Sequence, residues 1–187
     1  VAISETGTAK YAGGAAIGTK MYFVPFRQDN MGIYDVTAAT FSTLVAGAPG
    51  GPLFAYRGAA AVGTKVIFAP CAQSNVGIYD VDAAVFSTVA TTGDAGDAGG
   101  GVQRRRRTSR YDGAAAVGTK VIFAPGVQNN VGIFDVATSA FTTMDNTCLH
   151  TPTESEGGFN QSKCSGAAAV GTRVFFAPYL QDNMGIY

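Results

Sequence analysis

Four copies of a Gln-x-Asn triplet are the most regular polar feature of this chain of 187 residues. Their carboxamide side chains could hydrogen-bond a bound partner, or they could hydrogen-bond the backbone of their own loops. A polar group that recurs in every repeat is also what a folding requirement produces, so both interpretations stay open. The candidate binding residues from these triplets are Gln28, Asn30, Gln73, Asn75, Gln128, Asn130, Gln181 and Asn183.

A cluster of five arginines is the strongest local concentration of charge. Four of them are consecutive, Arg104, Arg105, Arg106 and Arg107, and Arg110 follows closely. Guanidinium groups bind phosphate and carboxylate groups through paired hydrogen bonds, so the cluster is a candidate site for an anion or an acidic protein partner. The alternative is a solvated loop whose charges repel one another.

Two cysteines and a histidine lie in the second long insert. A disulfide between Cys148 and Cys164 would close that insert and add about 3 kcal/mol of stability. A glycosylation sequon at Asn160 lies between them, and together these features favour a secreted or lumenal compartment. The alternative is two free thiols in a reducing cell. A zinc site that also used His150 would lack a fourth ligand, so no metal site is predicted.

The sequence favours a module without catalytic activity. Nucleophilic triads and most proton relays use a histidine, and His150 is the only one in the chain. Asp35, Asp80 and Asp135 recur at one position of the repeat and are expected to end strands. No cofactor is predicted. A pair of carboxylates brought together from distant repeats would still allow carbohydrate processing, so a carbohydrate-binding or carbohydrate-processing protein is the alternative.

Composition narrows the class of protein further. Lys and Arg together number 13, as do Asp and Glu, and this balance argues against a dedicated nucleic-acid binder. Apolar residues make up 47% of the chain, enough for a sizeable core, and 25 glycines favour many turns. The longest uncharged run, residues 36–56, is interrupted by Gly and Pro. We therefore expect no transmembrane segment.

Internal repetition decides the expected fold. The segment GAAAVGTKVIFAP occurs unchanged at residues 58–70 and 113–125, and close variants occupy residues 13–25 and 166–178. The copies are spaced roughly 45 to 55 residues apart, within the range of propeller blades. All the extra length falls in the connection between one unit and the next, which indicates a rigid unit with a tolerant surface loop. The predicted repeats are 11–55, 56–110, 111–163 and 164–187, the last incomplete.

Each repeat is expected to form four short antiparallel strands. In the second repeat these are Ala59 to Val62, Lys65 to Ala69, Val76 to Val81 and a strand centred on Phe86. The alanine-rich strand is expected to be innermost, because only small side chains fit where strands converge. The prediction is an all-β protein, a β-propeller of four-stranded antiparallel blades with four repeats visible.

The unit resembles the kelch repeat family over nearly the whole chain. The features in common are the apolar first strand, the aromatic second strand, the Tyr-Asp end of the third strand at Tyr34 and Tyr79, and the aromatic residue in the fourth strand. Two features differ, since Ala69-Pro70 replaces the usual double glycine and Phe86 replaces a tryptophan. The amino-acid sequence of the unit also resembles kelch-like repeat arrays of unicellular algae.

The expected architecture places all the variable features on one side. The loops between second and third strands and the connections between repeats should open on the same end of the propeller, where binding is expected. We therefore expect a protein-binding or scaffolding propeller, for example an accessory subunit of a larger assembly. The chain is expected to be a fragment of a larger propeller, the alternative being four blades closed by residues 1–7.

Overall fold

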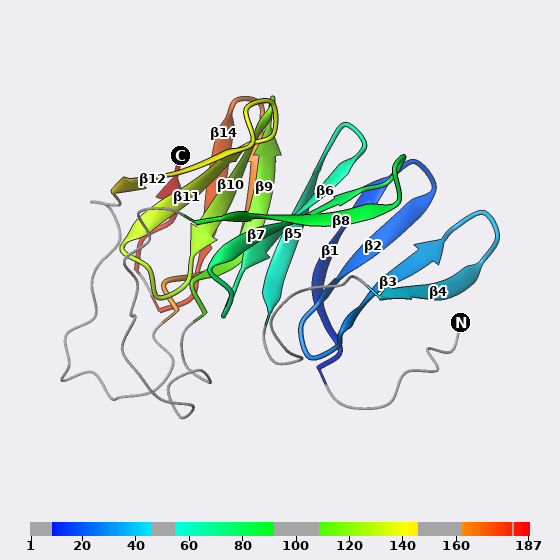
Figure 1. Ribbon diagram of the computed structural model, residues 1–187. Coiled ribbons are helices and arrows are strands. Elements are labelled where there is room, and N and C mark those ends of the chain that lie inside the picture. The colour runs from blue at the N-terminus through cyan, green and yellow to red at the C-terminus, as the bar shows by residue number, and fades with distance from the viewer. Residues whose placement is uncertain (1–8, 46–54, 92–108, 146–161, 181) are drawn as a thin grey trace.

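The computed structural model describes residues 9–45, 55–91, 109–145, 162–180 and 182–187, and within these ranges every regular element is a β-strand (Figure 1). The strands form four antiparallel sheets, each with its strands in chain order. Their bounds are β1 Tyr11–Ile17, β2 Lys20–Pro25, β3 Asn30–Asp35, β4 Thr40–Val45, β5 Tyr56–Val62, β6 Lys65–Pro70, β7 Asn75–Asp80, β8 Val85–Ala90, β9 Tyr111–Val117, β10 Lys120–Pro125, β11 Asn130–Asp135, β12 Ala140–Asp145, β13 Cys164–Val170, β14 Arg173–Pro178 and β15 Gly185–Ile186.

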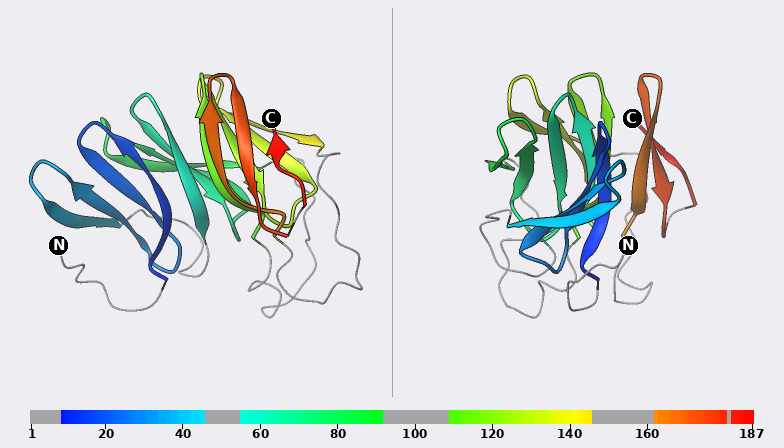
Figure 2. Two further views of the ribbon diagram at one scale, coloured as in Figure 1. Left: turned by 180° about the vertical axis from the view of Figure 1, so that it is seen from behind. Right: turned by 90° about the vertical axis from the view of Figure 1, so that its right-hand side faces the viewer.

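The predicted all-β fold is confirmed. The four sheets are arranged as the blades of a four-bladed β-propeller, and the fourth sheet has three strands within the described residues. Strands β1, β5, β9 and β13 are the innermost, and each of the first three contacts the innermost strand of the blade that follows it. Figures 1 and 2 show the blades side by side in a twisted row, with the first and the fourth blade at its two ends.

Turn chemistry explains where the strands reverse. A Gly-Thr pair joins the first and second strands of each blade, and its glycine has a positive φ, as at Gly63 with 58°. An aspartate ends the third strand and holds the next turn. The Oδ1 atom of Asp80 accepts backbone hydrogen bonds from Asp82 and Ala83, each at 3.2 Å. Asp35 and Asp135 make the same kind of contact, so the strand-ending role predicted for them is confirmed.

The innermost strands begin earlier than predicted. In the second blade the strand starts at Tyr56 rather than Ala59, because a register irregularity lets it continue past Gly58. Neighbouring blades approach each other closely at this glycine and at its equivalent in the next blade. A Cβ atom built on Gly58 would lie 2.8 Å from the Cα atom of Gly113, and one built on Gly113 would lie 2.7 Å from the Cα atom of Gly166. Glycine, more than alanine, therefore lets the blades converge.

The alanines of the innermost strands pack between blades. Ala60 lies in the core between the second and third blades, and Ala115 lies in the core between the third and fourth. Phe68 and Tyr79 pack in the core between the first and second blades, with Phe86 against it, as the sequence predicted for the wider space between blades.

Each blade has two apolar faces. We call the face turned towards the following blade the trailing face, and the face turned towards the preceding blade the leading face. Three clusters join a trailing face to the next leading face. The buried trailing residues include Tyr22, Val24 and Met31, then Ile67, Ala69 and Val76, then Ile122, Ala124 and Val131. The buried leading residues include Tyr56, Val66, Phe68 and Tyr79, then Tyr111, Val121, Phe123 and Phe134, then Cys164, Val174 and Phe176.

An aromatic trio recurs on the leading faces of the first three blades. In the second blade the ring of Tyr56 lies 5.9 Å from that of Phe68 and 6.2 Å from that of Phe86. The trio leaves no room for a side chain at Gly77, because a Cβ atom there would lie 3.0 Å from both Phe68 and Tyr56. The equivalent trios are Tyr11, Phe23 and Phe41, and Tyr111, Phe123 and Phe141.

Candidate functional site

The loops between second and third strands meet the segments that enter the innermost strands. The amide of Cys71 donates to the carbonyl of Ala55 at 3.1 Å, and the amide of Gly126 donates to that of Arg110 at 2.8 Å. The first and fourth blades make equivalent contacts. These two kinds of connection therefore share one end of the propeller, as expected. We call this the Q-x-N end, and the opposite end, which carries the uniform Gly-Thr turns, the Gly-Thr end.

The asparagines of the triplets support the fold in three blades. The hydroxyl of Tyr11 donates to Oδ1 of Asn30 at 2.7 Å, and the hydroxyl of Tyr56 donates to Oδ1 of Asn75 at 2.5 Å. The same bond joins Tyr111 to Asn130 at 2.6 Å. Each bond ties the third strand to the start of the innermost strand of its own blade. These amide oxygens are thus engaged within the protein, which favours the structural interpretation for them.

The other triplet residues are less uniform. Gln128 is buried, and its backbone carbonyl accepts a hydrogen bond from Nζ of Lys163 at 2.8 Å. Gln28 and Gln73 are half-buried and also have partners in the fold. Asn183 is exposed, and Cys164 stands where the other blades have the tyrosine. Gln181 lies outside the described residues.

A polar cluster crosses three blades at the Q-x-N end. Nη1 of Arg57, from the second blade, lies 3.1 Å from Oδ1 of Asp112, from the third. The hydroxyl of Ser162, which precedes the fourth blade, donates to Oδ2 of Asp112 at 2.7 Å. The hydroxyl of Ser109 also donates to this carboxylate. Arg57 and Asp112 are the second residues of the equivalent strands β5 and β9, each directly after the tyrosine, so the repeat itself places them side by side.

The two charged groups of this cluster differ in burial, which affects the pKa of Asp112. The side chain of Asp112 is 1% exposed and that of Arg57 is 39% exposed. Burial raises the pKa of Asp112, while the hydrogen bond from Ser162 and the charge of Arg57 oppose that rise. The guanidinium of Arg57 also lies 6.0 Å from the ring centre of Phe26, which extends the contacts to the first blade. With this contact, the cluster extends from the first blade to the segment that precedes the fourth.

The cysteines near this cluster are poor nucleophiles. Cys71 is buried with its sulfur 3.2 Å from the hydroxyl oxygen of Ser109, and burial raises its pKa to about 11. Burial likewise raises the pKa of the Cys164 thiol to about 11. Burial thus disfavours the thiolate form of both cysteines, and hydrogen bonds connect Cys71, Ser109 and Asp112.

Lysine 163 holds the fourth blade to the third. Lys163 is buried, and its ammonium group donates to the backbone of Gln128 and to the side chain of Asn129. Its backbone amide donates to the carbonyl of Gly126 at 2.9 Å. Burial lowers the pKa of this amine. These oxygen acceptors compensate the buried charge of the ammonium group, so Lys163 stabilises the packing of the fourth blade on the third.

Several predicted site residues lie outside the described residues, namely Arg104, Arg105, Arg106, Arg107 and Cys148, and so does His150. The fifth arginine is described. Arg110 donates through Nη2 to the hydroxyl of Ser74 at 3.1 Å, and its backbone amide donates to the carbonyl of Cys71 at 3.0 Å. The end of the basic insert is thus attached to a Q-x-N loop. Cys164, the described half of the predicted disulfide, is fully buried at the start of β13.

Sequence reasoning missed Arg57, Ser109, Asp112, Ser162 and Lys163. A signal was present for the first and third, because both follow a tyrosine that recurs in register at Tyr11, Tyr56 and Tyr111. No such signal marks the two serines, which lie in connections of unequal length. Within the described ranges, no three His, Cys, Asp or Glu side chains come together to hold a metal ion, and no helix could span a membrane.

Solved structures of other proteins share this arrangement of blades. The computationally designed Ika4 protein matches with a TM-score of 0.60 and 9% identity, over 98% of this chain and 93% of its own. Virginiamycin B lyase from Staphylococcus aureus matches with a TM-score of 0.63 and 10% identity, over 94% of this chain and 50% of its own. Glutaminyl cyclase of Myxococcus xanthus matches with a TM-score of 0.57 and 11% identity, over 94% and 72%.

The likeness is one of fold. These identities are too low to carry an activity from one protein to another, and the matched proteins include a designed protein and two different enzymes. No protein-family model matches the sequence, and no curated protein matches it. The propeller is therefore established, and its function has to be argued from its own surface.

Proposed function

We infer that this propeller is a non-catalytic binding or scaffolding module that holds a protein partner at its Q-x-N end. The observation that carries the proposal is the contrast between the two ends. The Gly-Thr turn is the same in all four blades, whereas the loops of the Q-x-N end differ from blade to blade. Differing loops on a uniform framework are the usual basis of recognition.

The framework under these loops is rigid. Tyrosine hydroxyls fix three of the loops from below, and the Arg57–Asp112 pair joins neighbouring blades there. A surface that is already ordered loses little conformational entropy on binding, which favours affinity. The buried and fully bonded carboxylate of Asp112 supports this surface and is not offered to a substrate.

The arginines of the basic insert indicate that the expected partner is acidic. Arg110 attaches the insert to the Q-x-N end, so the Arg104 to Arg107 cluster is proposed to lie at the rim of the binding surface. Exposed rim charges mainly steer association. We expect an acidic protein to associate more slowly when Arg104, Arg105, Arg106 and Arg107 are replaced by Ser, with a flatter dependence on salt. Kinetics in a surface-binding assay would measure both, and unchanged rates would remove the cluster from the proposal.

Site-specific photocrosslinking tests the proposal as a whole. A crosslinking amino acid would replace Asp29 at the Q-x-N end, and in the matched control it would replace Thr19 at the Gly-Thr end of the same blade; both residues are exposed. We expect a defined protein adduct from position 29 and none from position 19. An adduct from position 19 alone, or specific glycan-array binding without any protein adduct, would contradict the proposal, the latter in favour of a carbohydrate-binding propeller.

A further inference from the structure

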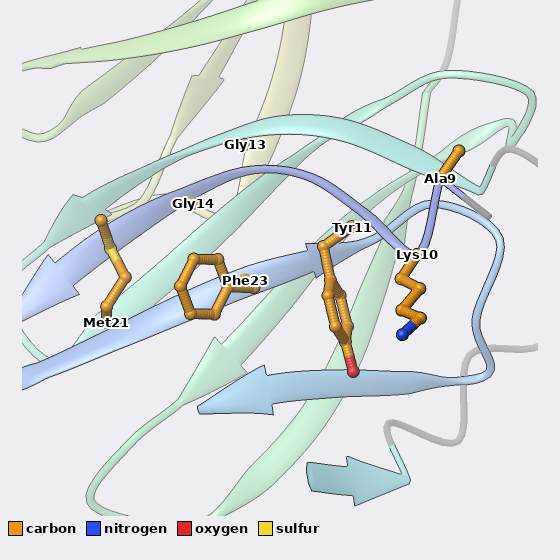
Figure 3. A pocket seen from close by; sticks show the side chains of 7 residues that line it. All are labelled: Ala9, Lys10, Tyr11, Gly13, Gly14, Met21 and Phe23. Atoms are coloured by element: carbon orange, nitrogen blue, oxygen red, sulfur yellow. The ribbon is translucent and has the colours of Figure 1, made fainter. Parts of the chain in front are cut away.

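The entry to each innermost strand carries one cationic side chain. In the first, third and fourth blades this residue stands directly before the first residue of the strand, and in the second blade it stands directly after it. The four residues are Lys10, Arg57, Arg110 and Lys163. Figure 3 shows the first of them, Lys10, where the chain enters β1 beside Tyr11. Because the innermost strands of neighbouring blades contact one another, these charges lie at the inner rim of the Q-x-N end.

The two ends of the propeller differ in their balance of charge. At the Gly-Thr end, the described turns and strand ends carry equal numbers of cations and carboxylates, namely Lys20, Lys65, Lys120 and Arg173 with Asp35, Asp80, Asp82 and Asp135. At the Q-x-N end, the described loops and entry segments carry Lys10, Arg27, Arg57, Arg110 and Lys163 but only Asp29, Asp112 and Asp182. An acidic partner is therefore attracted to the Q-x-N end.

Arg57 is the cation of this rim that is both oriented and accessible. Its Nη1 atom lies 3.1 Å from Oδ1 of Asp112, and its Cζ atom lies 6.0 Å from the ring centre of Phe26. The side chain of Asp112 is 1% exposed, whereas that of Arg57 is 39% exposed. A guanidinium has five N–H donors in a planar fork, so a group held by one carboxylate can bind a second. A side chain that is already oriented loses little conformational entropy on binding.

Arg57 is also particular to one blade. The residues at the equivalent position of the other innermost strands are Ala12, Asp112 and Ser165. The asparagines of the triplets, by contrast, recur and are hydrogen-bonded by tyrosines in three blades. A residue that recurs in every repeat is what a folding requirement produces, and Arg57 does not recur. Its position is therefore a better candidate for recognition than the triplets are.

We propose that Arg57 is the anchor of the Q-x-N end and binds a carboxylate of an acidic peptide segment, with Arg110 as the second cation. This rests on the proposed function and names the group that the partner presents. The amide of Arg110 donates to the carbonyl of Cys71 at 3.0 Å, and the amide of Cys71 donates to that of Ala55, two residues before Arg57. Nη2 of Arg110 donates to the hydroxyl of Ser74 in the same loop. The two arginines thus flank one Q-x-N loop.

A carboxylate fits this position better than a phosphate. The charge of Asp112 lies beside the guanidinium of Arg57 and repels any second anion that binds there. This repulsion grows with the charge of the ligand. A carboxylate carries one negative charge, whereas a phosphorylated side chain carries about two near neutral pH. The site therefore selects glutamate or aspartate over a phosphorylated residue.

Fluorescence polarisation with a labelled hexaglutamate peptide tests the proposal. Every chain in the assay would carry Ser in place of Arg104, Arg105, Arg106 and Arg107, so that the insert contributes no binding. The comparison is between Asp112→Asn and the double variant Arg57→Gln with Asp112→Asn, because these differ only at Arg57 and neither leaves a buried carboxylate without its cation. We expect hexaglutamate to bind about tenfold or more weakly to the double variant, the loss of a charged hydrogen-bonded contact.

The second ion pair of the described chain provides the matched control. Lys65 and Asp80 lie 3.0 Å apart at the Gly-Thr end, and the side chain of Lys65 is 41% exposed. Adding Lys65→Gln to Asp80→Asn should leave the affinity for hexaglutamate unchanged. A labelled hexaglutamine peptide should not bind, and circular dichroism would verify that the sheets of each variant are intact.

The results that would overturn the proposal are distinct from those that bear on the proposed function. Absence of hexaglutamate binding, or an affinity that is the same with and without Arg57, would remove Arg57 as an anchor. Tighter binding of a phosphoserine peptide of the same length would overturn the choice of carboxylate. A protein adduct from the crosslinker at position 29 that persists undiminished without Arg57 would also reject the anchor, yet keep the Q-x-N end as the binding surface. Hexaglutamate binding through Arg57 without any such adduct would contradict the proposed function alone.

Discussion

The Nη1 atom of Arg57 lies 3.1 Å from the Oδ1 atom of Asp112, and this ion pair crosses from the second blade to the third. The carboxylate is almost entirely buried, while the guanidinium is partly open to solvent. Removing one partner of such a pair destabilises the fold strongly, because the other charge stays buried without compensation. The pair therefore joins the second and third blades at the Q-x-N end.

Replacing Arg57 by Ala is expected to lower the free energy of unfolding by about 1–3 kcal/mol, because Asp112 would lose a charged hydrogen-bond donor while remaining buried. The double variant with Asp112→Asn should recover part of that loss. Lys65→Ala is the matched control, since Lys65 and Asp80 lie 3.0 Å apart and their side chains are 41% and 26% exposed. Its cost should be clearly smaller than that of Arg57→Ala. Urea unfolding would compare them, and equal losses would contradict the role assigned to burial.

The dependence of stability on pH should carry opposite contributions from Asp112 and Asp80. Burial raises the pKa of Asp112 in the folded protein, so its contribution to stability is complete below the unfolded pKa and is lost as pH rises through the folded pKa. The pKa of Asp80 is lowered, chiefly by the hydrogen bond from Lys65. Its contribution is therefore present above the unfolded pKa and is lost as pH falls.

Thermal unfolding of two variants would separate these contributions. Between about pH 3 and 7, the advantage in Tm of the parent chain over Asp112→Asn should shrink as pH rises. Its advantage over Asp80→Asn should instead grow. Parallel profiles for the two variants would show that the buried carboxylate does not titrate as its surroundings imply.

The glycines of the innermost strands should be far less tolerant than those of the turns. Gly58 has a φ of 84°, and a Cβ atom there would meet the backbone of Gly113 at 2.8 Å. We expect Gly58→Ala to cost on the order of 3 kcal/mol through overpacking and backbone strain. Gly63→Ala shares the positive φ but meets nothing within 4 Å, so it should cost about 1 kcal/mol. Equal Tm losses would contradict the close approach of the blades.

Much of this fold could be predicted from the sequence, because the same pattern of strand and turn residues occurs in all four repeats. The Gly-Thr turns, Pro70 and the aspartate turns bound the strands through local chemistry, which sequence reasoning reads directly. The start of the innermost strand at Tyr56 was missed, since the hydrogen bond of its hydroxyl to Asn75 forms only when the blade is folded. The Gly58–Gly113 contact between blades is equally invisible in a single repeat.

The candidate site was less predictable for a different reason. The triplets were found because they recur, but recurrence also marks residues that the fold requires, and Asn30, Asn75 and Asn130 proved to be held by tyrosines. The recurring tyrosine marks the position of Asp112, but the carboxylate occurs there in one repeat only, and nothing in the repeat marks Ser162. Their meeting depends on how far one blade turns relative to the next.

The predicted disulfide between Cys148 and Cys164 can be decided by peptide mapping without reduction. Cys164 is fully buried at the start of β13, and as a thiol its pKa would be about 11. If the pair forms in protein from its native source, a linked peptide should be found, and reduction should cost about 3 kcal/mol. Cys71 is the internal control, because it should resist alkylation until the chain unfolds. Two free thiols would remove both the disulfide and the argument for an oxidising compartment.

The turns between third and fourth strands offer a stabilising substitution. Ala84 ends such a turn with a φ of 54°, in the left-handed region that costs a residue with a Cβ atom about 1 kcal/mol. Ala84→Gly removes this strain, and the gain exceeds the entropy that glycine adds to the unfolded chain. We expect a net increase in unfolding free energy of at most about 0.5 kcal/mol. Ala39 and Ser139 occupy the same position, with φ values of 52° and 53°, so their glycine variants should add to the gain.

A neighbouring alanine in the same turn provides the control for this last substitution. Ala83 is exposed like Ala84, but its φ is not positive, and its amide donates to Asp80, a bond that glycine would keep. Ala83→Gly should therefore only increase the entropy of the unfolded chain and lower stability by about 0.5–1 kcal/mol. Chemical denaturation of the two single variants would measure opposite signs. Destabilisation by both would mean that the turn is not held in the left-handed conformation in solution, and that Asp80 fixes it less firmly than its two backbone hydrogen bonds imply.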